Sequence, residues 1–158
     1  EIPMRLENTC IIPTDISNAW ALIMDIPRAA ACVPGLKEIT PDGENRFKAV
    51  LQVRVGPMGL NFIGTVVVLE TDKAHGEAKI QVEAADRRVG GSIKADMTVK
   101  LTTASAARDY SAQTQLSIIT ETAFMGKLGE LGQPLMRRKA ATTIEEFAKN
   151  LAKIVPAP

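Results

Sequence analysis

The chain has 158 residues, and its 19 Lys and Arg nearly balance its 18 Asp and Glu, for a formal net charge of +1. This balance excludes the strongly basic surface expected of a nucleic-acid-binding protein. A chain of this length buries about 70% of its unfolded surface in one core without a disulfide or a metal. We therefore expect one domain over residues 4–153, with the basic groups Arg87–Arg88 and Arg137–Lys139 on solvated faces.

The cysteines and the hydropathy of the chain predict its compartment. Cys10 and Cys32 are too few for a disulfide framework and suit buried thiols in a reducing environment. No apolar run reaches the 18 residues that indicate a membrane span, and no signal peptide is recognisable before Met4, which resembles a natural start. These features predict a cytoplasmic protein.

The first third of the chain predicts one strand and two short helices. Residues 4–13 have the composition of a strand, and Asp15 provides N-cap chemistry for a helix over residues 16–26. Pro27 suits the first turn of a second short helix that continues to residue 33. Pro34 and Gly35 end that helix.

From residue 36 the hydrophobic period changes to two, which indicates six further strands. Most of them alternate between an apolar and a polar face, as in an antiparallel sheet with one solvated side. The predicted strands cover residues 36–40, 47–55, 61–71, 78–84, 93–101 and 110–121.

The inward faces of these strands mix large and small side chains, and the chain has only four Phe, one Trp and one Tyr. A strongly curved sheet with this composition either encloses unfilled apolar space or is closely packed with aliphatic residues. The large inward residues are Phe47, Leu51, Phe62, Met97 and Leu101, and the small ones are Ala49, Gly64, Ala78, Ala84, Ala95 and Ala112.

The last third of the chain, residues 124–155, predicts a long helix. Apolar residues recur at intervals of three and four at Ile144, Phe147, Leu151 and Ile154. Pro134 suits a first helical turn, so the regular helix either begins near it or kinks there.

Three glycines precede that proline and disfavour a regular helix. Gly126, Gly129 and Gly132 either form a floor for a flat ligand or mark an irregular helix start in close contact with the sheet. Leu128, Leu131 and Leu135 would be the walls of such a floor. Together the elements predict an α+β fold in which a curved seven-stranded antiparallel sheet wraps a long C-terminal helix, with two short helices after the first strand.

Residue types that carry catalysis are sparse in this chain. The one histidine, His75, lies in a predicted turn, and neither a CxxC motif nor a GxSxG motif is present. Cys10 and Cys32 lie among apolar residues, where a thiol is normally inert. Glu83 and Asp96 fall on outward faces of their strands. We therefore expect no metal site and no catalytic residues.

Four stretches of the chain carry a resemblance to a known family. They are ACVPGL (Ala31–Leu36), GPMGLNFIGTV (Gly56–Val66), VGGSIKADMTVKL (Val89–Leu101) and GKLGELGQPL (Gly126–Leu135). They resemble the CoxG family of carbon monoxide dehydrogenase proteins, within the START/Bet v 1 superfamily of helix-grip folds. Pro134 departs from the family pattern, in which a charged residue is more usual.

The resemblance implies a non-catalytic carrier with an apolar cavity between the sheet and the long helix. The implied cargo is a lipophilic molecule, such as a quinone or another prenylated or lipid molecule, with no covalent cofactor. The implied partner is a molybdenum hydroxylase of the carbon monoxide dehydrogenase type. The carrier would take electrons from this enzyme to the membrane, where it would make peripheral contact at the inner face.

Two alternatives remain open at this stage. The first is a membrane-recruitment or assembly factor without a ligand, which would use Arg137–Lys139 and an apolar patch at Met58–Leu60. The second is a cyclase-like or hydrolase-like enzyme, as found among superfamily relatives, which would need polar groups facing the cavity.

The residues expected to bind the ligand are apolar and lie on inward faces or in the segment before the long helix. They are Leu36, Val53, Val55, Met58, Phe62, Val66, Ile80, Val82, Met97, Val99, Leu116, Phe124, Leu128, Leu131 and Leu135.

Overall fold

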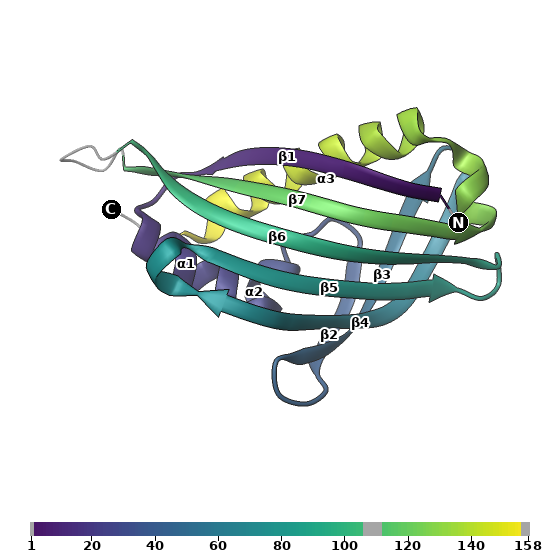
Figure 1. The fold of residues 1–158 in the computed structure, drawn as a ribbon, viewed down its shortest axis with the longest axis horizontal. Coiled ribbons are helices and arrows are strands. Elements are labelled where there is room, and N and C mark those ends of the chain that lie inside the picture. Colours follow the sequence, from purple (N-terminus) through teal and green to yellow (C-terminus); the bar gives the residue numbers. More distant parts are fainter. Residues whose placement is uncertain (1, 106–111, 156–158) are drawn as a thin grey trace.

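A curved antiparallel sheet with one long helix against its concave face forms the body of the molecule (Figure 1). The computed structural model describes residues 2–105 and 112–155. Within these residues the strand order is β1-β7-β6-β5-β4-β3-β2, and every neighbouring pair is antiparallel. The strands are β1 (Ile2–Ile12), β2 (Leu36–Pro41), β3 (Arg46–Val55), β4 (Met58–Asp72), β5 (Glu77–Asp86), β6 (Gly91–Ser105) and β7 (Gln113–Gly126).

The helices complete the predicted helix-grip arrangement, which is confirmed. They are α1 (Ile16–Met24), α2 (Ile26–Ala30), the short 3-10 helices η1 (Lys73–His75) and η2 (Lys127–Leu131), and the long α3 (Gln133–Ile154). Asp15 caps α1 by accepting a hydrogen bond from the backbone N–H of Asn18 at 2.8 Å. Pro134 lies in the first turn of α3, so the long helix begins there. No helix among the described residues is long and apolar enough to cross a bilayer.

Several predicted boundaries differ from the structure. The last strand continues to Gly126 because Phe124 pairs with Ile93 on β6, so Phe124 belongs to the sheet. The predicted start of that strand, Tyr110, lies outside the described residues. β4 begins at Met58 rather than residue 61, since Met58 already pairs with Val55 across a tight turn. The second helix ends at Ala30, after which the backbone continues in tight turns.

Two hydrophobic clusters divide the interior along the length of the sheet. One lies where α1 meets the C-terminal part of α3, and both Ile12 and Leu151 are completely buried in it. The other lies beneath η2 and is centred on Leu128, Phe124 and Leu60. α3 runs along both clusters, since Leu151 belongs to the first and Met136 to the second (Figure 1).

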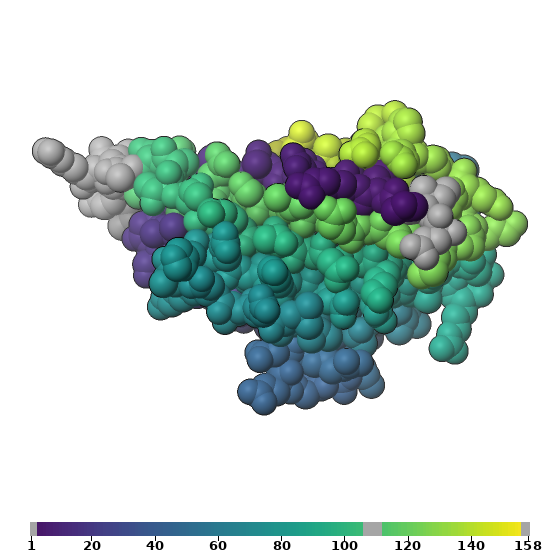
Figure 2. Space-filling model, viewed as in Figure 1, coloured from purple at the N-terminus to yellow at the C-terminus, as the bar shows by residue number. Residues whose placement is uncertain are grey.

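Strands β4 to β7 cross the outer face of the sheet in Figure 2. This face carries cross-strand ion pairs, and β4 also exposes Ile63 and Leu69. Arg5 Nη1 lies 2.6 Å from Glu121 Oε1, and Lys94 Nζ lies 3.6 Å from Glu83 Oε1. Glu83 and Asp96 are both exposed on this face, as the strand alternation predicted. Exposed pairs of this kind contribute little stability, so the fold depends on its inner face.

Candidate functional site

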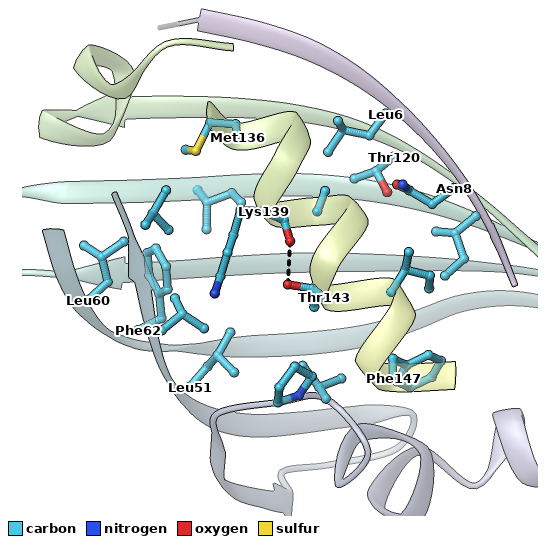
Figure 3. A pocket seen from close by; sticks show the side chains of 18 of the residues that line it. Leu6, Asn8, Leu51, Leu60, Phe62, Thr120, Met136, Lys139, Thr143 and Phe147 are labelled. Atoms are coloured by element: carbon cyan, nitrogen blue, oxygen red, sulfur yellow. Dashed lines mark hydrogen bonds between the residues drawn. The ribbon is translucent and has the colours of Figure 1, made fainter. Parts of the chain in front are cut away.

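An apolar cavity of about 380 Å³ lies between α3 and the concave face of the sheet (Figure 3). This volume falls within the range of about 300–1,000 Å³ that is typical of small-molecule sites. Side chains from five strands, from the α2–β2 turn, from η2 and from α3 form its wall. They are Leu6, Asn8, Val33, Pro34, Leu51, Val53, Val55, Leu60, Phe62, Ile93, Met97, Ile118, Thr120, Phe124, Leu128, Met136, Lys139, Ala140, Thr143, Ile144 and Phe147.

One face of α3 forms a long side of the cavity. Met136, Ala140, Thr143 and Phe147 follow one another at intervals of three and four, which places them on the same side of the helix. The predicted apolar face of this helix therefore continues toward its N-terminus past Ile144 and becomes more polar there. Beyond Phe147 the same face enters the core, where Leu151 is completely buried.

The turn between α2 and β2 supplies Val33 and Pro34 to the cavity wall and is held from two sides. Gly35 has φ +89°, and a β-carbon there would lie 2.1 Å from the backbone oxygen of Gln52, so a glycine is needed for this close approach. On the helix side, Asn150 Nδ2 donates a hydrogen bond to the backbone oxygen of Cys32 at 2.9 Å. The turn that contains VPGL is thus held against β3 by Gly35 and against α3 by the hydrogen bond from Asn150.

The end of the cavity near η2 is closed by the most deeply buried lining residues. Leu128 is 1% exposed, and Leu60 and Val55 are 4% and 5% exposed. A smaller cavity of about 250 Å³ lies next to this end, shares Phe124, Leu128 and Met136 with the main one, and is also lined by Gly129 and Gly132. Two of the three glycines before α3 therefore lie beside an apolar space, whereas Gly126 ends β7.

Four lining residues are polar: Asn8, Thr120, Lys139 and Thr143. The Thr143 hydroxyl donates to the backbone oxygen of Lys139 at 2.7 Å, within α3. The Lys139 side chain extends from α3 into the cavity toward Leu51 and Phe62, on the side away from Asn8 and Thr120 (Figure 3). The prediction of a solvated face is therefore wrong for Lys139, although Arg137 and Arg138 are exposed.

The lining contains no acidic side chain, histidine or cysteine among the described residues. His75 lies in η1, exposed, with Nδ1 2.7 Å from Asp72 Oδ2, and this hydrogen bond lowers the pKa of the Asp72 carboxyl. Burial raises the pKa of the Cys10 thiol to about 11 and also raises the pKa of the Cys32 thiol. The part of the chain that the structure describes holds no group of three or more His, Cys, Asp or Glu side chains suited to a metal.

Six of the fifteen predicted ligand-binding residues line the main cavity: Val53, Val55, Phe62, Met97, Phe124 and Leu128. The other nine are not part of its wall. Ile80, Val99 and Leu116 lie in the core cluster near α1, and Val66 and Val82 pack against it. Met58, Leu131 and Leu135 pack against the cluster under η2, and Leu36 is half-buried at the start of β2. A ligand contact for each of the fifteen stays a prediction.

The sequence did not predict the part of the cavity wall that α3 and the α2–β2 turn supply. It assigned Leu60 to a surface patch at Met58–Leu60, but Leu60 is 4% exposed and faces the cavity, so no such patch includes it. The helix side of the wall could have been found by extending the spacing of Ile144 and Phe147 backwards to Met136. Asn8 and Thr120 gave no signal, because they interrupt otherwise apolar strand faces.

Comparison with known proteins identifies the family. A family model for CoxG, a subunit of carbon monoxide dehydrogenase, matches residues 10–155. The chain belongs to this family. The predicted resemblance is thereby confirmed over nearly the whole chain. A search of curated proteins finds no match.

Solved structures share the fold at low sequence identity. A conserved protein from Geobacillus kaustophilus has a TM-score of 0.83 at 20% identity, covering 96% of this chain and 95% of that one. Norcoclaurine synthase from Thalictrum flavum has a TM-score of 0.66 at 13% identity, covering 98% and 87%. The Zhui aromatase/cyclase from Streptomyces sp. R1128 has a TM-score of 0.58 at 15% identity, covering 98% and 92%. At these identities the similarity shows the fold alone.

Proposed function

We propose that this protein carries a lipophilic molecule, a quinone or another prenylated or lipid molecule, in the cavity between α3 and the sheet. The observation that supports this most directly is the cavity of about 380 Å³, whose wall is apolar except for four residues. Removing apolar surface from water contributes roughly 25 cal/mol per Å². A ring with a short prenyl chain buries several hundred Å², which after the costs of association corresponds to roughly micromolar affinity.

The family indicates the setting of this carrier. A CoxG protein would serve a molybdenum hydroxylase of the carbon monoxide dehydrogenase type, and a carried quinone would take the electrons of that enzyme to the membrane. The protein would work in the cytoplasm with peripheral contact at the inner face of the membrane and would bind its quinone without a covalent bond. The wall contains one ionisable side chain, Lys139, and no carboxylate, histidine or thiol among the described residues. An acid–base pair, or a nucleophile beside a second group that acts as its base, is therefore missing from the described wall, which fits binding better than turnover.

A matched pair of substitutions on α3 tests the carrier function. Ala140 lines the cavity, whereas its neighbour Ala141 is exposed. Ala140→Phe should fill part of the cavity, and Ala141→Phe should leave it open. Mass spectrometry of an organic extract of the purified protein should detect an apolar molecule in the wild type and in Ala141→Phe. Ala140→Phe should lose that molecule and bind a short-chain ubiquinone at least about tenfold more weakly.

The opposite result would favour a different function. A wild-type protein that releases no apolar molecule and takes up no ubiquinone on titration is not a carrier. If it then co-sediments with anionic vesicles in a salt-sensitive manner, recruitment of the hydroxylase to the membrane explains the protein better.

A further inference from the structure

Lys139 is the one charged side chain among the described residues that line the apolar cavity. It lies on α3, is half-buried, and reaches between the helix and the strands that carry Leu51 and Phe62 (Figure 3). An ammonium group offers three hydrogen-bond donors and no acceptor. Any partner for Lys139 inside the cavity must therefore supply an oxygen or another acceptor atom.

The described part of the protein supplies no such partner. The ion pairs formed among residues 2–105 and 112–155 leave Lys139 out, and the cavity wall contains no carboxylate. The nearest side-chain hydroxyl on the same helix face, Thr143, already donates to the backbone oxygen of Lys139. Lys139 is only half-buried, so water can supply acceptors while the cavity holds no ligand. A ligand that displaces this water must supply an acceptor of its own, because an unpaired charge beside apolar surface costs free energy.

The walls around Lys139 place the apolar part of a ligand. Toward η2 the cavity is closed by buried residues, including Leu60, Phe62 and Met136, all less than 9% exposed. In Figure 3 Lys139 extends toward Phe62, with Leu60 beyond it, while Met136 lies nearer the start of α3. We expect the apolar part of a ligand to fill this closed end. An oxygen bonded directly to that apolar part would then lie within reach of Lys139.

We propose that Lys139 binds an acceptor oxygen of the cargo, so that the cavity selects apolar molecules that bear a carboxylate or a carbonyl group. Neutral alcohols, which lack the charge of a carboxylate, bind less well than carboxylates, and amines, which repeat the charge of Lys139, are disfavoured. This inference rests on the proposed carrier function and adds the polar end of the ligand to it. Lys139 is a binding residue in this account and takes part in no covalent step.

The test compares three variants with probes that differ only at the polar end. Lys139→Met keeps most of the length of the side chain and removes its charge, and Lys139→Arg keeps the charge. Lys149→Met, on the exposed face of the same helix, is the matched control. The probes are dodecanoate, dodecanol and dodecylamine, with a ubiquinone of one isoprene unit as the carbonyl probe, all measured by displacement of the neutral dye N-phenyl-1-naphthylamine.

We expect Lys139→Met to bind the dye like the wild type but to bind dodecanoate, the ubiquinone or both about 10- to 100-fold more weakly, the range for a hydrogen bond to a charged group. Lys139→Arg should retain most of the affinity, and Lys149→Met should change nothing. Loss for dodecanoate alone identifies a carboxylate ligand, and loss for the ubiquinone alone identifies a carbonyl ligand.

Two results would overturn the inference. If the dye binds but Lys139→Met changes no probe by more than about twofold, or dodecylamine binds the wild type as well as both dodecanoate and the ubiquinone, the role of Lys139 is wrong while the carrier function stands. If neither the dye nor any probe binds the wild type, the carrier function itself fails, and the role of Lys139 fails with it.

Discussion

Leu128 packs directly on Gly91: a β-carbon on Gly91 would lie only 2.8 Å from Cγ of Leu128. Leu128 is 1% exposed and closes the η2 end of the cavity. The backbone of Gly91 is not in the left-handed region, so its role is to leave space for the leucine. The end wall of the cavity thus depends on a missing side chain in the first residue of β6.

Gly91→Ala should therefore overpack this contact and displace η2. We expect a loss of about 1–3 kcal/mol in the free energy of unfolding, the range for an extra methyl group in a packed core. Urea denaturation measures this loss. Gly59→Ala is the control, because a β-carbon there meets no atom within 4 Å and should change stability by less than about 0.5 kcal/mol. Equal effects of the two substitutions would mean that Leu128 relaxes freely.

Leu151 should be the residue of α3 whose truncation costs most. It is 0% exposed in the cluster that joins α3 to α1, away from the cavity, so its removal leaves a void that no ligand fills. We expect Leu151→Ala to reduce the free energy of unfolding by about 2–5 kcal/mol. Leu69→Ala, at a leucine 53% exposed on β4, should cost less than about 0.5 kcal/mol. Thermal and denaturant unfolding monitored by circular dichroism measures both losses. Similar losses for the two variants would mean that residues other than Leu151 hold α3 on the sheet.

The Cys10 thiol should be unreactive in the folded protein at neutral pH. Burial raises the pKa of this thiol to about 11, from the 9.0 of a thiol in water. At pH 8 the folded protein therefore holds roughly 100-fold less Cys10 thiolate than the unfolded chain. Because the folded pKa is raised, the associated stability is present below the unfolded pKa of 9.0 and is lost as the pH rises toward about 11.

Mass spectrometry after iodoacetamide treatment measures the rate of Cys10 alkylation in native protein and in protein unfolded by urea. We expect slow modification of the native protein at pH 8 that accelerates as the pH approaches about 11. Native and unfolded rates that agree at pH 8 would contradict the effect of burial.

Asp86 should contribute to stability in a pH-dependent manner. The pKa of its carboxyl is lowered, chiefly because the backbone N–H of Asn61 donates to Oδ2 at 2.8 Å, with help from the Val89 N–H and the Arg88 guanidinium. The unfolded pKa of an aspartate is about 3.9. The stabilisation is therefore fully present above about pH 4 and is lost as the pH falls through the folded pKa.

Asp86→Asn removes this titration, so its melting temperature should be lower than that of the wild type at pH 7 and should fall less between about pH 4 and pH 2. Differential scanning fluorimetry across this range provides the measurement. Asp96→Asn, at an exposed site on β6, is the control and should follow the wild-type curve. If the melting temperatures of the wild type and Asp86→Asn fall by the same amount between about pH 4 and pH 2, another carboxylate causes the loss of stability in acid.

The order and type of the elements could be predicted from local patterns. Alternation from Phe47 to Val55 indicates a strand with its apolar side inward, and Pro134 marks the start of the long helix. These signals are short-range, since side-chain direction in a strand repeats every two residues and helix starts depend on adjacent residues. The wall formed by Val53, Val55 and Phe62 follows from the same alternation.

The position of the cavity along the strands required contacts between distant residues. Val99 and Met97 both lie on the inner face of β6, yet Val99 is buried in the core near α1 and Met97 lines the cavity. Strand period assigns a residue to a face but does not say which other element covers it at that point. α1 and the C-terminal part of α3 fill one end of the concave face, and this decides where free volume remains.

Hydrophobic period, turn residues and capping residues in the chain were enough to establish a helix-grip fold with an apolar inner face, because each of these signals acts within a few residues. The orientation of Lys139 toward the cavity, the closure of one end by Leu128 on Gly91, and the placement of Val33 and Pro34 in the wall arise only when the segments pack together. Packing depends on the combined shape of residues far apart in the sequence, and no local pattern encodes that shape.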